Sequence, residues 1–569
     1  MKLSPYIALA IDYDGTLALN GKVARETVVE LEKFLATGRL LVLVSGRELG
    51  ELGKLFPQLN LFSWVVAENG AVAYEPATRR EVLLTGAVKE ELYQSLLQAK
   101  VEPLFRGKVI LATQEPNESV VLDHIRNLGL ELQLIFNKGA VMVLPPGINK
   151  ATGLDFALRE LKLSSKNILG IGDAENDHSF MSVCGCSFAV ANALDSIKQI
   201  ATARTTRPNG AGVREVITHV LENMVPPPKI EVPLLIDLQG EMYSLSPFRD
   251  NILIAGKPGK GKSTVAVGLL ERLNERGYQY CVIDPESDYE EMPNAVVLGS
   301  PSRPPELKSI FELLENSFDN LIVNISGIAL ADRVSFFVAF AKKFQAMKSH
   351  LGRPHFLLID EAHHVLPREI LHELPFRAED LSGWCFVTVF PRELHHELIL
   401  ATNLLLAFDG EDRMISAQFA AARGIDRPAS SAQSAEDALS LWDIGRSPSL
   451  ISVEIIPPAQ KPPRHRGKYA EGELPDDRSF YFRGPEGKLN LKAHNLSLFV
   501  QIGEGVDDTT WSYHLHNGDY SDWFRTGVKD KGLAQAVERI ASLSSVSVQE
   551  ARQMLKREIE QRYLPPVES

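Results

Sequence analysis

The chain is 569 residues long, which exceeds what one hydrophobic core normally supports and predicts about three or four domains. Its composition, 44% hydrophobic and 23% charged, is typical of globular proteins, and its formal net charge of -13 argues against a generally basic nucleic-acid-binding surface. No apolar run reaches the ~20 residues of a membrane span. The N-terminal apolar stretch lacks a cleavage signature, and the four cysteines are scattered. We therefore expect a cytoplasmic protein without a signal peptide, a membrane anchor or a disulfide framework.

Two proline-rich stretches divide the chain. The first covers residues 226–228, and the second runs from residue 457 to residue 466. Proline fixes φ and removes a backbone donor, so such runs usually connect packed elements. We expect three domains, at residues 1–225, 229–456 and 469–569.

The first domain is predicted to be an α/β domain with a parallel sheet. Short apolar runs alternate with helical patterns such as residues 24–36, and this alternation is typical of strands joined by crossover helices. The expected strands are 7–11, 40–44, 64–66 and 168–171. Residues about 80–145 predict an inserted small α/β unit, with strands near 108–112, 131–136 and 140–144 and a helix near 118–128.

Two carboxylates follow the first expected strand. Asp12 and Asp14 occupy positions i and i+2 in Asp-Tyr-Asp-Gly-Thr-Leu, where Gly15 permits a tight turn. One carboxylate can attack a phosphoryl group while the other transfers a proton. Phosphoryl transfer also requires positive charge beside the equatorial oxygens. The pattern therefore indicates phosphoryl chemistry at this strand end.

The remaining parts of such a site follow in chain order. They are Ser-Gly-Arg at residues 45–47, Lys150 before a helix, and Gly-Asp-Ala-Glu-Asn-Asp at residues 172–177. Together they resemble the haloacid dehalogenase (HAD) superfamily, and within it the Cof-like (type IIB) capped phosphatases, over essentially all of residues 1–220. Glu-Asn-Gly at 68–70 and Ala-Val-Ala-Asn-Ala at 189–193 also look like that subfamily. Several motifs in this order favour this interpretation over a merely solvated turn.

The resemblance implies a role for each residue. Asp12 would be the nucleophile that forms an aspartyl-phosphate, and Asp14 the general acid/base. Ser45 would hold the phosphoryl oxygens, and Lys150 would neutralise charge on the nucleophile and the phosphate. The family usually has a glycine directly after this lysine, whereas here the nearest glycine is Gly153.

The resemblance also implies a metal and a substrate class. Asp173 and Asp177 would hold Mg²⁺, with Asp12 and the carbonyl of Asp14 as further ligands, and Mg²⁺ prefers such oxygen ligands. The core would be Rossmann-like, and the insert at about 80–145 would be its cap. Because a closing cap excludes water and bulky chains, the expected substrate is a small phosphorylated metabolite such as a sugar phosphate or phosphoglycolate.

The second domain carries a glycine-rich loop between a strand and a helix. The apolar run at 251–255 leads into Gly-Lys-Pro-Gly-Lys-Gly-Lys-Ser-Thr at residues 256–264, and a helical pattern follows at 265–276. Such glycines let backbone N–H groups surround phosphates at a helix N-terminus. Lys262 would reach the β- and γ-phosphates and Ser263 would ligate Mg²⁺. The predicted ATP-binding residues of this loop are Gly256, Gly259, Gly261, Lys262, Ser263 and Thr264.

A second acidic motif follows about a hundred residues later. The apolar run 356–359 ends in Asp360, a predicted Mg²⁺ and ATP-binding residue, and Glu361, which would orient the attacking water. Further strands are expected at 280–284, 321–325 and 385–389. With Asp-Pro-Glu-Ser-Asp-Tyr at 284–289, these motifs resemble the HerA–FtsK group of P-loop ATPases over roughly residues 230–450. That group commonly forms hexameric rings that move nucleic acid or protein, so a homo-oligomeric ring is implied, although the net charge does not support a nucleic-acid partner.

The sequence departs from that group beyond the acidic motif. The group often has a polar sensor, usually Gln, at the end of the next strand, whereas Thr388 is the nearest hydroxyl here and Phe390 stands near the expected amide. We therefore expect slow or differently coupled hydrolysis. Arg392, Arg413 and Arg423 are candidate trans-acting arginine fingers, with ordinary surface arginines as the favoured alternative for each. His363 and His364, together with His395 and His396, could suggest a metal site, with helix-flanking surface histidines as the favoured alternative.

The third domain, residues 469–569, is predicted to be a small α+β domain. Its segments 480–485 and 511–525 interleave aromatic residues with Arg and His, and a helical pattern closes the chain at 548–563. Such a stripe could stack nucleic-acid bases, but a core and its rim are the favoured interpretation. No activity follows from these residues.

The favoured hypothesis is a Mg²⁺-dependent phosphatase that acts through an aspartyl-phosphate and is fused to an ATP-hydrolysing module. One alternative is a nucleic-acid end-processing phosphatase/kinase in which Asp284 activates a hydroxyl. The Asp-Glu pair at 360–361 and the acidic net charge count against it. Another alternative is a nucleotide-gated ring assembly that acts on nucleic acid.

Overall fold

The computed structural model describes residues 5–226, 231–257, 259–370, 374–409, 413–430, 439–447, 449–459, 469–470, 474, 476–528, 530–543 and 546–563. Most of the two proline-rich stretches and Pro258 of the glycine-rich loop therefore lie outside the described residues. The chain divides into two compact units. The first consists of residues 1–281, 307–320 and 334–459, and the second of residues 282–306, 321–333 and 460–569.

The core sheet of the first domain has the strand order β12-β11-β10-β1-β2-β3-β4-β5. From β12 to β3 neighbouring strands are parallel, and β4 and β5 are added antiparallel. The strands are β1 (Ala8–Asp12), β2 (Leu40–Val44), β3 (Trp64–Ala67), β4 (Val72–Glu75), β5 (Arg80–Leu83), β10 (Ile168–Gly172), β11 (Cys186–Ala189) and β12 (Ala203–Arg204). The four predicted strands are thus confirmed. Strand β5 was not predicted, because its largely exposed residues carry no apolar run.

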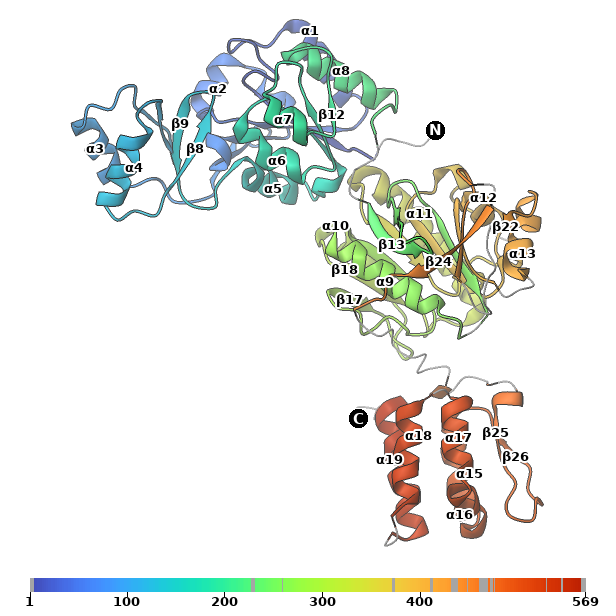
Figure 1. Cartoon of the computed structure of the whole chain (residues 1–569). Coiled ribbons are helices and arrows are strands. Elements are labelled where there is room, and N and C mark those ends of the chain that lie inside the picture. Colours follow the sequence, from blue (N-terminus) through green and yellow to red (C-terminus); the bar gives the residue numbers. More distant parts are fainter. Residues whose placement is uncertain are drawn as a thin grey trace. The chain divides into compact units, whose positions relative to one another are not determined.

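Helices cover both faces of this sheet. Figure 1 shows α1 beside α8 on one face and α5 beside α6 on the other. The helices are α1 (Arg25–Leu35), α2 (Leu49–Leu55), α5 (Lys150–Glu160), α6 (His178–Val183), α7 (Asp195–Ile200) and α8 (Asn209–Leu221). The start of α5 is set by a capping box, in which the Asn149 side chain accepts from the N–H groups of Ala151 and Thr152. This cap puts Lys150 in the first turn.

The insert forms a four-stranded antiparallel sheet in the order β6-β7-β9-β8, with two helices over one face (Figure 1). Its elements are α3 (Glu90–Gln98), β6 (Phe105–Arg106), β7 (Leu111–Gln114), α4 (Glu118–Asn127), β8 (Gln133–Asn137) and β9 (Ala140–Leu144). Successive strand residues serve opposite faces. Leu134 and Val143 pack under the helices, whereas Ile135 and Met142 pack against the core domain. The insert therefore lies on the core through one face of its sheet.

The second domain places its glycine-rich loop after a central strand. In the first unit the strand order is β14-β13-β24-β23-β21-β15-β20-β19, and β15 is parallel to both of its neighbours. The strands are β13 (Val232–Asp237), β14 (Met242–Leu245), β15 (Ile252–Gly256), β19 (Phe356–Ile359), β20 (Trp384–Thr388), β21 (Leu404–Phe408), β23 (Leu439–Asp443) and β24 (Ser449–Ile455). The short β22 (Ala429–Ser430) pairs with β24.

Helices and further strands complete this part of the chain. They are α9 (Lys262–Glu275), β16 (Tyr280–Asp284), β17 (Ala295–Leu298), α10 (Leu307–Asn316), β18 (Asn320–Asn324), α11 (Leu330–Leu351), α12 (His396–Ala401) and α13 (Met414–Arg423). The strands expected at 251–255, 280–284, 321–325, 356–360 and 385–389 are present as β15, β16, β18, β19 and β20, shifted by at most one residue at either end.

The C-terminal part of the second unit is an α+β domain, as predicted. A hairpin of β25 (Phe480–Phe482) and β26 (Leu491–Ala493) precedes α15 (Leu496–Gly505), α16 (Asp508–His516), α17 (Asp519–Thr526), α18 (Lys531–Ala541) and α19 (Val548–Tyr563). Most of the aromatic stripe is buried in one core that includes Phe480, Phe499, Trp511, Tyr520 and Trp523. Among the described residues, no helix has the length and apolar character that crossing a membrane requires.

Candidate functional site

The residues of the first motif set meet at one edge of the core sheet. Asp12 is the last residue of β1, Ser45 follows β2, and Asp173 follows β10. These three strands are adjacent and parallel, so their carboxyl ends lie together. The turn after β10 adds Asp177, whose Oδ2 accepts from the backbone N–H groups of Asp173 at 2.8 Å and Ala174 at 2.9 Å.

A buried lysine joins two of these carboxylates. Lys150 Nζ lies 2.5 Å from Asp12 Oδ1 and 2.6 Å from Asp177 Oδ1. The three residues are 1%, 4% and 0% exposed. Burial opposes the charged form of Lys150, but the two carboxylates outweigh burial and raise its pKa. Lys150 is therefore a fixed cation beside Asp12.

Three buried carboxylates gather closely enough to bind a metal ion. Asp12, Asp173 and Asp177 each offer an oxygen, and these oxygens lie within 4.8 Å of one another. Burial, followed by the charge of Asp177, raises the pKa of Asp12, and burial raises that of Asp173. A divalent cation would remove this electrostatic cost, and oxygen donors suit Mg²⁺. The residues present therefore fit the implied Mg²⁺.

Asp14 forms an ion pair with Arg47, a residue to which the sequence alone assigned no role. Arg47 Nε lies 2.5 Å from Asp14 Oδ2, and Nη2 lies 2.9 Å from Oδ1, a bidentate arrangement. The Asp14 side chain is 37% exposed, in contrast to Asp12. Ser45 is buried, and its Oγ accepts from the Arg47 N–H at 3.1 Å. Arg47 stood in the quoted Ser-Gly-Arg motif, but nothing local indicated its partner.

The cap contributes a second cation. Lys138, in the turn between β8 and β9, forms an ion pair with Asp173. A Cβ on Gly15 would clash with the Asp173 carboxylate and lie 2.9 Å from Lys138 Nζ, so a glycine with φ of 83° is required there. Asn192 donates to the Gly15 carbonyl at 2.7 Å. Sequence reasoning missed Lys138, because a lysine in a hairpin turn is ordinarily a solvated residue.

Glu68 of the core anchors the segment of the cap that connects β6 to β7. This fully buried carboxylate accepts the backbone N–H groups of Lys108 at 2.8 Å, Val109 at 2.8 Å and Ile110 at 3.1 Å. A Cβ on Gly107 would lie 2.5 Å from a Glu68 oxygen. Glu68 of the quoted Glu-Asn-Gly motif therefore positions the cap.

The unusual glycine spacing after Lys150 has a packing reason. A Cβ on Gly153 would clash with the Val66 side chain and lie 2.7 Å from Gly70 Cα. Helix α5 therefore packs too closely against β3 and the turn after it for any side chain at position 153. Ala151 is only half-buried, so a glycine is not needed at that position.

The glycine-rich loop brings Lys262 to the start of α9. Gly261, with φ of 111°, is the N-cap residue, and Lys262 Nζ donates to the Gly256 carbonyl at 2.9 Å. A Cβ on Gly256 would lie 2.6 Å from Phe408 Cβ. Ser263 and Thr264 follow in the first turn of the helix. The backbone thus has the strand–loop–helix arrangement of a phosphate-binding loop.

The acidic motif lies two strands away from the loop. Asp360 follows β19 and is 3% exposed, with its Oδ1 accepting from the Glu361 N–H at 2.9 Å. Glu361 has a left-handed backbone with φ of 39° and a side chain that is 16% exposed. Backbone strain of this kind in a non-glycine residue is common at functional sites.

One histidine near this motif lies beside the end of β20. The His363 side chain is only 18% exposed, and its Nδ1 lies 3.4 Å from Glu361 Oε2 and 3.2 Å from Thr388 Oγ1. Thr388 ends β20 and is fully buried. The His363 side chain is therefore more buried than a typical surface histidine, because packing of β20 beside β19 brings a hydroxyl to it. Arg392 stacks on Phe390, with 5.4 Å between the guanidinium carbon and the ring centroid.

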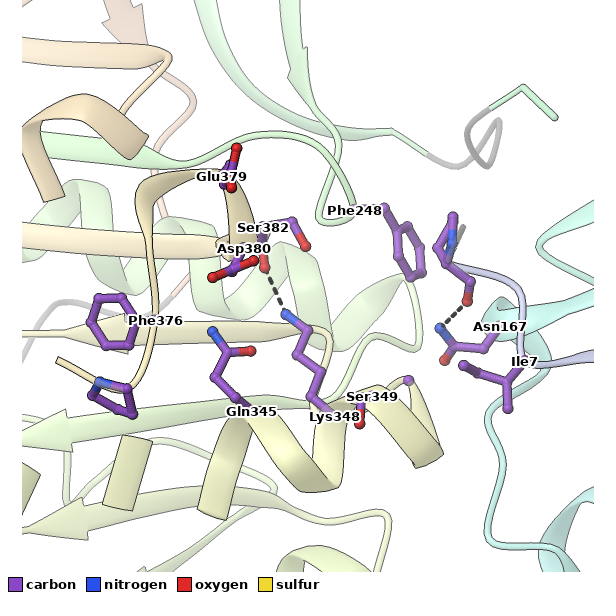
Figure 2. Close-up of a pocket in the computed structure, with 13 residues that line it drawn as sticks. Ile7, Asn167, Phe248, Gln345, Lys348, Ser349, Phe376, Glu379, Asp380 and Ser382 are labelled. Carbon is purple, nitrogen blue, oxygen red and sulfur yellow. Dashed lines mark hydrogen bonds between the residues drawn. The ribbon is translucent and has the colours of Figure 1, made fainter. Parts of the chain in front are cut away.

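A separate cavity of about 300 Å³ lies near the amino ends of β19 and β20 (Figure 2). Lys348 is among its lining residues, and its Nζ donates to the Ser382 carbonyl at 2.6 Å. Burial lowers the pKa of Lys348 to about 7. None of the site residues predicted from sequence lines this cavity.

Two family models match the chain. Residues 9–115 and 107–217 match haloacid dehalogenase-like hydrolases, and residues 249–398 match an AAA domain. The phosphoglycolate phosphatase 2 of Saccharolobus solfataricus is 29% identical over 223 residues, which are 38% of this chain and 92% of that protein. The phosphoglycolate phosphatase of Methanothermobacter thermautotrophicus is 27% identical over 220 residues, 37% of this chain and 96% of that protein.

A solved haloacid dehalogenase-like hydrolase from B. subtilis is also similar, with 19% identity and a TM-score of 0.33. The match covers 37% of this chain and 99% of that structure.

Proposed function

We propose that this chain, which contains a haloacid dehalogenase-like hydrolase domain followed by an AAA-type P-loop domain, is a Mg²⁺-dependent phosphatase of a small phosphorylated metabolite fused to an ATP-hydrolysing module. The observation that carries the phosphatase assignment is the buried triad of Asp12, Lys150 and Asp177. A buried cation that holds one oxygen of a carboxylate leaves the other oxygen oriented for attack.

Asp12 would act as the nucleophile, and Asp14 would transfer the protons. The free oxygen of Asp12 attacks phosphorus, the bond from phosphorus to the ester oxygen breaks, and Asp14 gives that oxygen a proton. Asp14 then takes a proton from water, whose oxygen attacks phosphorus and releases phosphate from Asp12. Ser45 would hold a phosphoryl oxygen. Bound Mg²⁺, held by Asp12, Asp173, Asp177 and the Asp14 carbonyl, would supply positive charge beside the phosphoryl group.

Two further cations support a small acidic substrate. Arg47 and Lys138 bring positive charge to Asp14 and Asp173 from the core and from the cap. A substrate with a second anionic group, as in phosphoglycolate, would gain an ion pair from either side chain. The two relatives named above are phosphoglycolate phosphatases, which supports this class, and sugar phosphates are the alternative.

A substrate panel tests the phosphatase assignment. The full chain with Mg²⁺ should release phosphate from phosphoglycolate faster than from hexose phosphates, and Asp12→Asn should abolish release. Faster release from a hexose phosphate would overturn the acidic substrate class. No release from any small phosphomonoester, with ATP hydrolysis intact, would overturn the phosphatase assignment itself.

The P-loop domain would bind ATP through its glycine-rich loop. Lys262 would contact the β- and γ-phosphates, Ser263 and Asp360 would hold Mg²⁺, and Glu361 would orient water. Lys262→Ala should abolish ATP hydrolysis and spare phosphate release from the metabolite, while Asp12→Asn should do the reverse. Loss of both activities in either variant would contradict independent centres. The ring assembly stays a prediction, tested by light scattering with and without ATP.

A further inference from the structure

We propose that His363 and Thr388 form a positioning pair for Glu361, in which the imidazole links the catalytic carboxylate to the end of β20. This inference rests on the proposed role of Glu361 in ATP hydrolysis. It concerns the position at which the sequence departs from the HerA–FtsK pattern, because no amide side chain stands at the end of β20.

Glu361 needs an anchor beyond its own backbone. It lies past the end of β19, in a left-handed conformation that starts a short helical turn, so no strand pairing fixes its side chain. A carboxylate that orients water must be held within a narrow range of positions, because small displacements cost large factors in rate. A polar neighbour with a fixed position can supply that restraint.

Thr388 has such a fixed position. Its side chain is fully buried, and its residue pairs in register with Ala255, which directly precedes Gly256 of the phosphate-binding loop. Strand β20, which carries the Thr388 hydroxyl, therefore pairs directly with β15, the strand that leads into the phosphate-binding loop. A hydroxyl oxygen can accept from an imidazole that carries its proton on Nδ1, and only this protonated nitrogen can also face the Glu361 carboxylate.

His363 approaches both groups through one atom. Nδ1 lies within hydrogen-bond distance of the Thr388 hydroxyl, at 3.2 Å, and at an ion-pair distance of 3.4 Å from the Glu361 carboxylate. The imidazole also lines an open pocket with Arg368 and Arg392, so this polar link lies where solvent can enter. A displacement of β20 relative to β19 would move the hydroxyl and, through the imidazole, the carboxylate. The pair therefore relates the geometry of the sheet to the orientation of Glu361.

Steady-state ATP hydrolysis and nucleotide binding of the full chain test this link. His363→Leu and Thr388→Val should each lower kcat about 10- to 100-fold and leave the Kd of a fluorescent ATP analogue within about twofold, because the pair orients Glu361 and does not bind phosphate. Thr388→Ser, which retains the hydroxyl, should hydrolyse ATP nearly as fast as the wild type. His363→Asn, which retains a polar atom near Nδ1, should exceed His363→Leu. His396→Ala, at an exposed histidine of the same domain, is the matched control.

Two combined variants separate positioning from a structural role. The His363→Leu/Thr388→Val double variant should be no slower than the slower single variant, and His363→Leu should have no further effect in a Glu361→Gln background. Multiplicative losses, or equal losses in Thr388→Ser and Thr388→Val, would overturn the proposal. Unchanged kcat in both single variants would also overturn it. If Glu361→Gln alone retains full hydrolysis, the role proposed for Glu361 in ATP hydrolysis is wrong. If Glu361→Gln lowers kcat but the His363 and Thr388 variants do not, only the positioning pair is wrong. Single-turnover measurements with enzyme in excess give the same comparison if steady-state turnover is slow.

Discussion

Lys150 Nζ lies 2.5 Å from a carboxylate oxygen of Asp12, although 138 positions separate the two residues in the chain. The contact requires that α5 begin at Lys150 and pack against β2 and β3, the strands next to β1 in the sheet. It also places a buried positive charge where phosphoryl transfer needs one.

Replacement of Lys150 by methionine should remove phosphatase turnover and destabilise the hydrolase domain by about 3–5 kcal/mol, because buried carboxylates lose their partner. The pKa of Asp12, which burial already raises, would then rise further, so Asp12 would be easier to protonate in the folded than in the unfolded state. A raised folded pKa gives stability at low pH that is lost as pH rises, so the defect should be larger at pH 8 than at pH 5. Thermal unfolding at both pH values checks this, with Lys33→Met at an exposed lysine as control. A defect that does not depend on pH would contradict it.

Replacement of Gly153 by alanine should lower kcat of the phosphatase about tenfold and cost about 1–3 kcal/mol of stability. The added methyl group meets Val66 and the backbone of Gly70, so α5 must shift and carry Lys150 with it. The matched variant is Ala151→Gly, which restores the spacing usual in the family. It should cost about 0.5–1 kcal/mol through helix propensity and keep kcat. Equal kcat for the two variants would show that close packing at position 153 does not position Lys150.

Replacement of Lys138 by glutamine should tighten Mg²⁺ binding several-fold in the absence of substrate and raise KM for an acidic substrate. The ammonium group pairs with Asp173, so it competes with a cation for that carboxylate. Calorimetric titration with Mg²⁺ measures the first effect and initial rates the second. Lys108→Gln is the cap control, because its side chain pairs with Glu81 instead. Weaker Mg²⁺ binding in Lys138→Gln would refute the competition.

Replacement of Lys348 by methionine should change how stability depends on pH. Burial lowers the folded pKa of Lys348 to about 7, while the unfolded side chain titrates near 10.4. Between these values the unfolded chain binds the extra proton, so Lys348 makes stability rise with pH from about 7 to 10. The difference in unfolding temperature between wild type and variant should therefore shift in favour of the wild type from pH 7 to pH 9. A constant difference in calorimetry would disprove the shifted pKa.

Local patterns accounted for the strands that carry the site residues and for the ends at which these residues stand. Fully buried strands such as β1 and β15 are continuous apolar runs, and the motif residues follow them directly. The hairpin strand β5 and helix α3 were missed. Strand β5 spans only four residues, which are largely exposed, and α3 spans only nine, of which Leu92 and Leu96 are buried. Elements this short are hard to separate from loops by periodicity alone.

The site residues also fall into two groups, those that local sequence predicts and those that only tertiary packing reveals. Asp12, Asp14, Asp173 and Asp177 could be predicted because strand ends and spacing within one turn are local properties of the chain. Arg47 stood in a known motif, yet its partner Asp14 depends on the pairing of β1 with β2. Lys138 arrives from the inserted cap, so only the packing of the cap on the core could reveal it.

The amino-acid sequence by itself predicted phosphoryl transfer in the first domain and ATP binding in the second. The reason is that paired carboxylates and a glycine-rich loop are patterns of a few consecutive residues. Only the tertiary structure decided which side chains come into contact. Lys150 contacts Asp12 and Asp177, and His363 lies beside Thr388 and Glu361. The physical reason is that side-chain contacts act over a few ångströms. Whether residues distant in the chain come that close depends on strand order and helix packing, which no local pattern encodes.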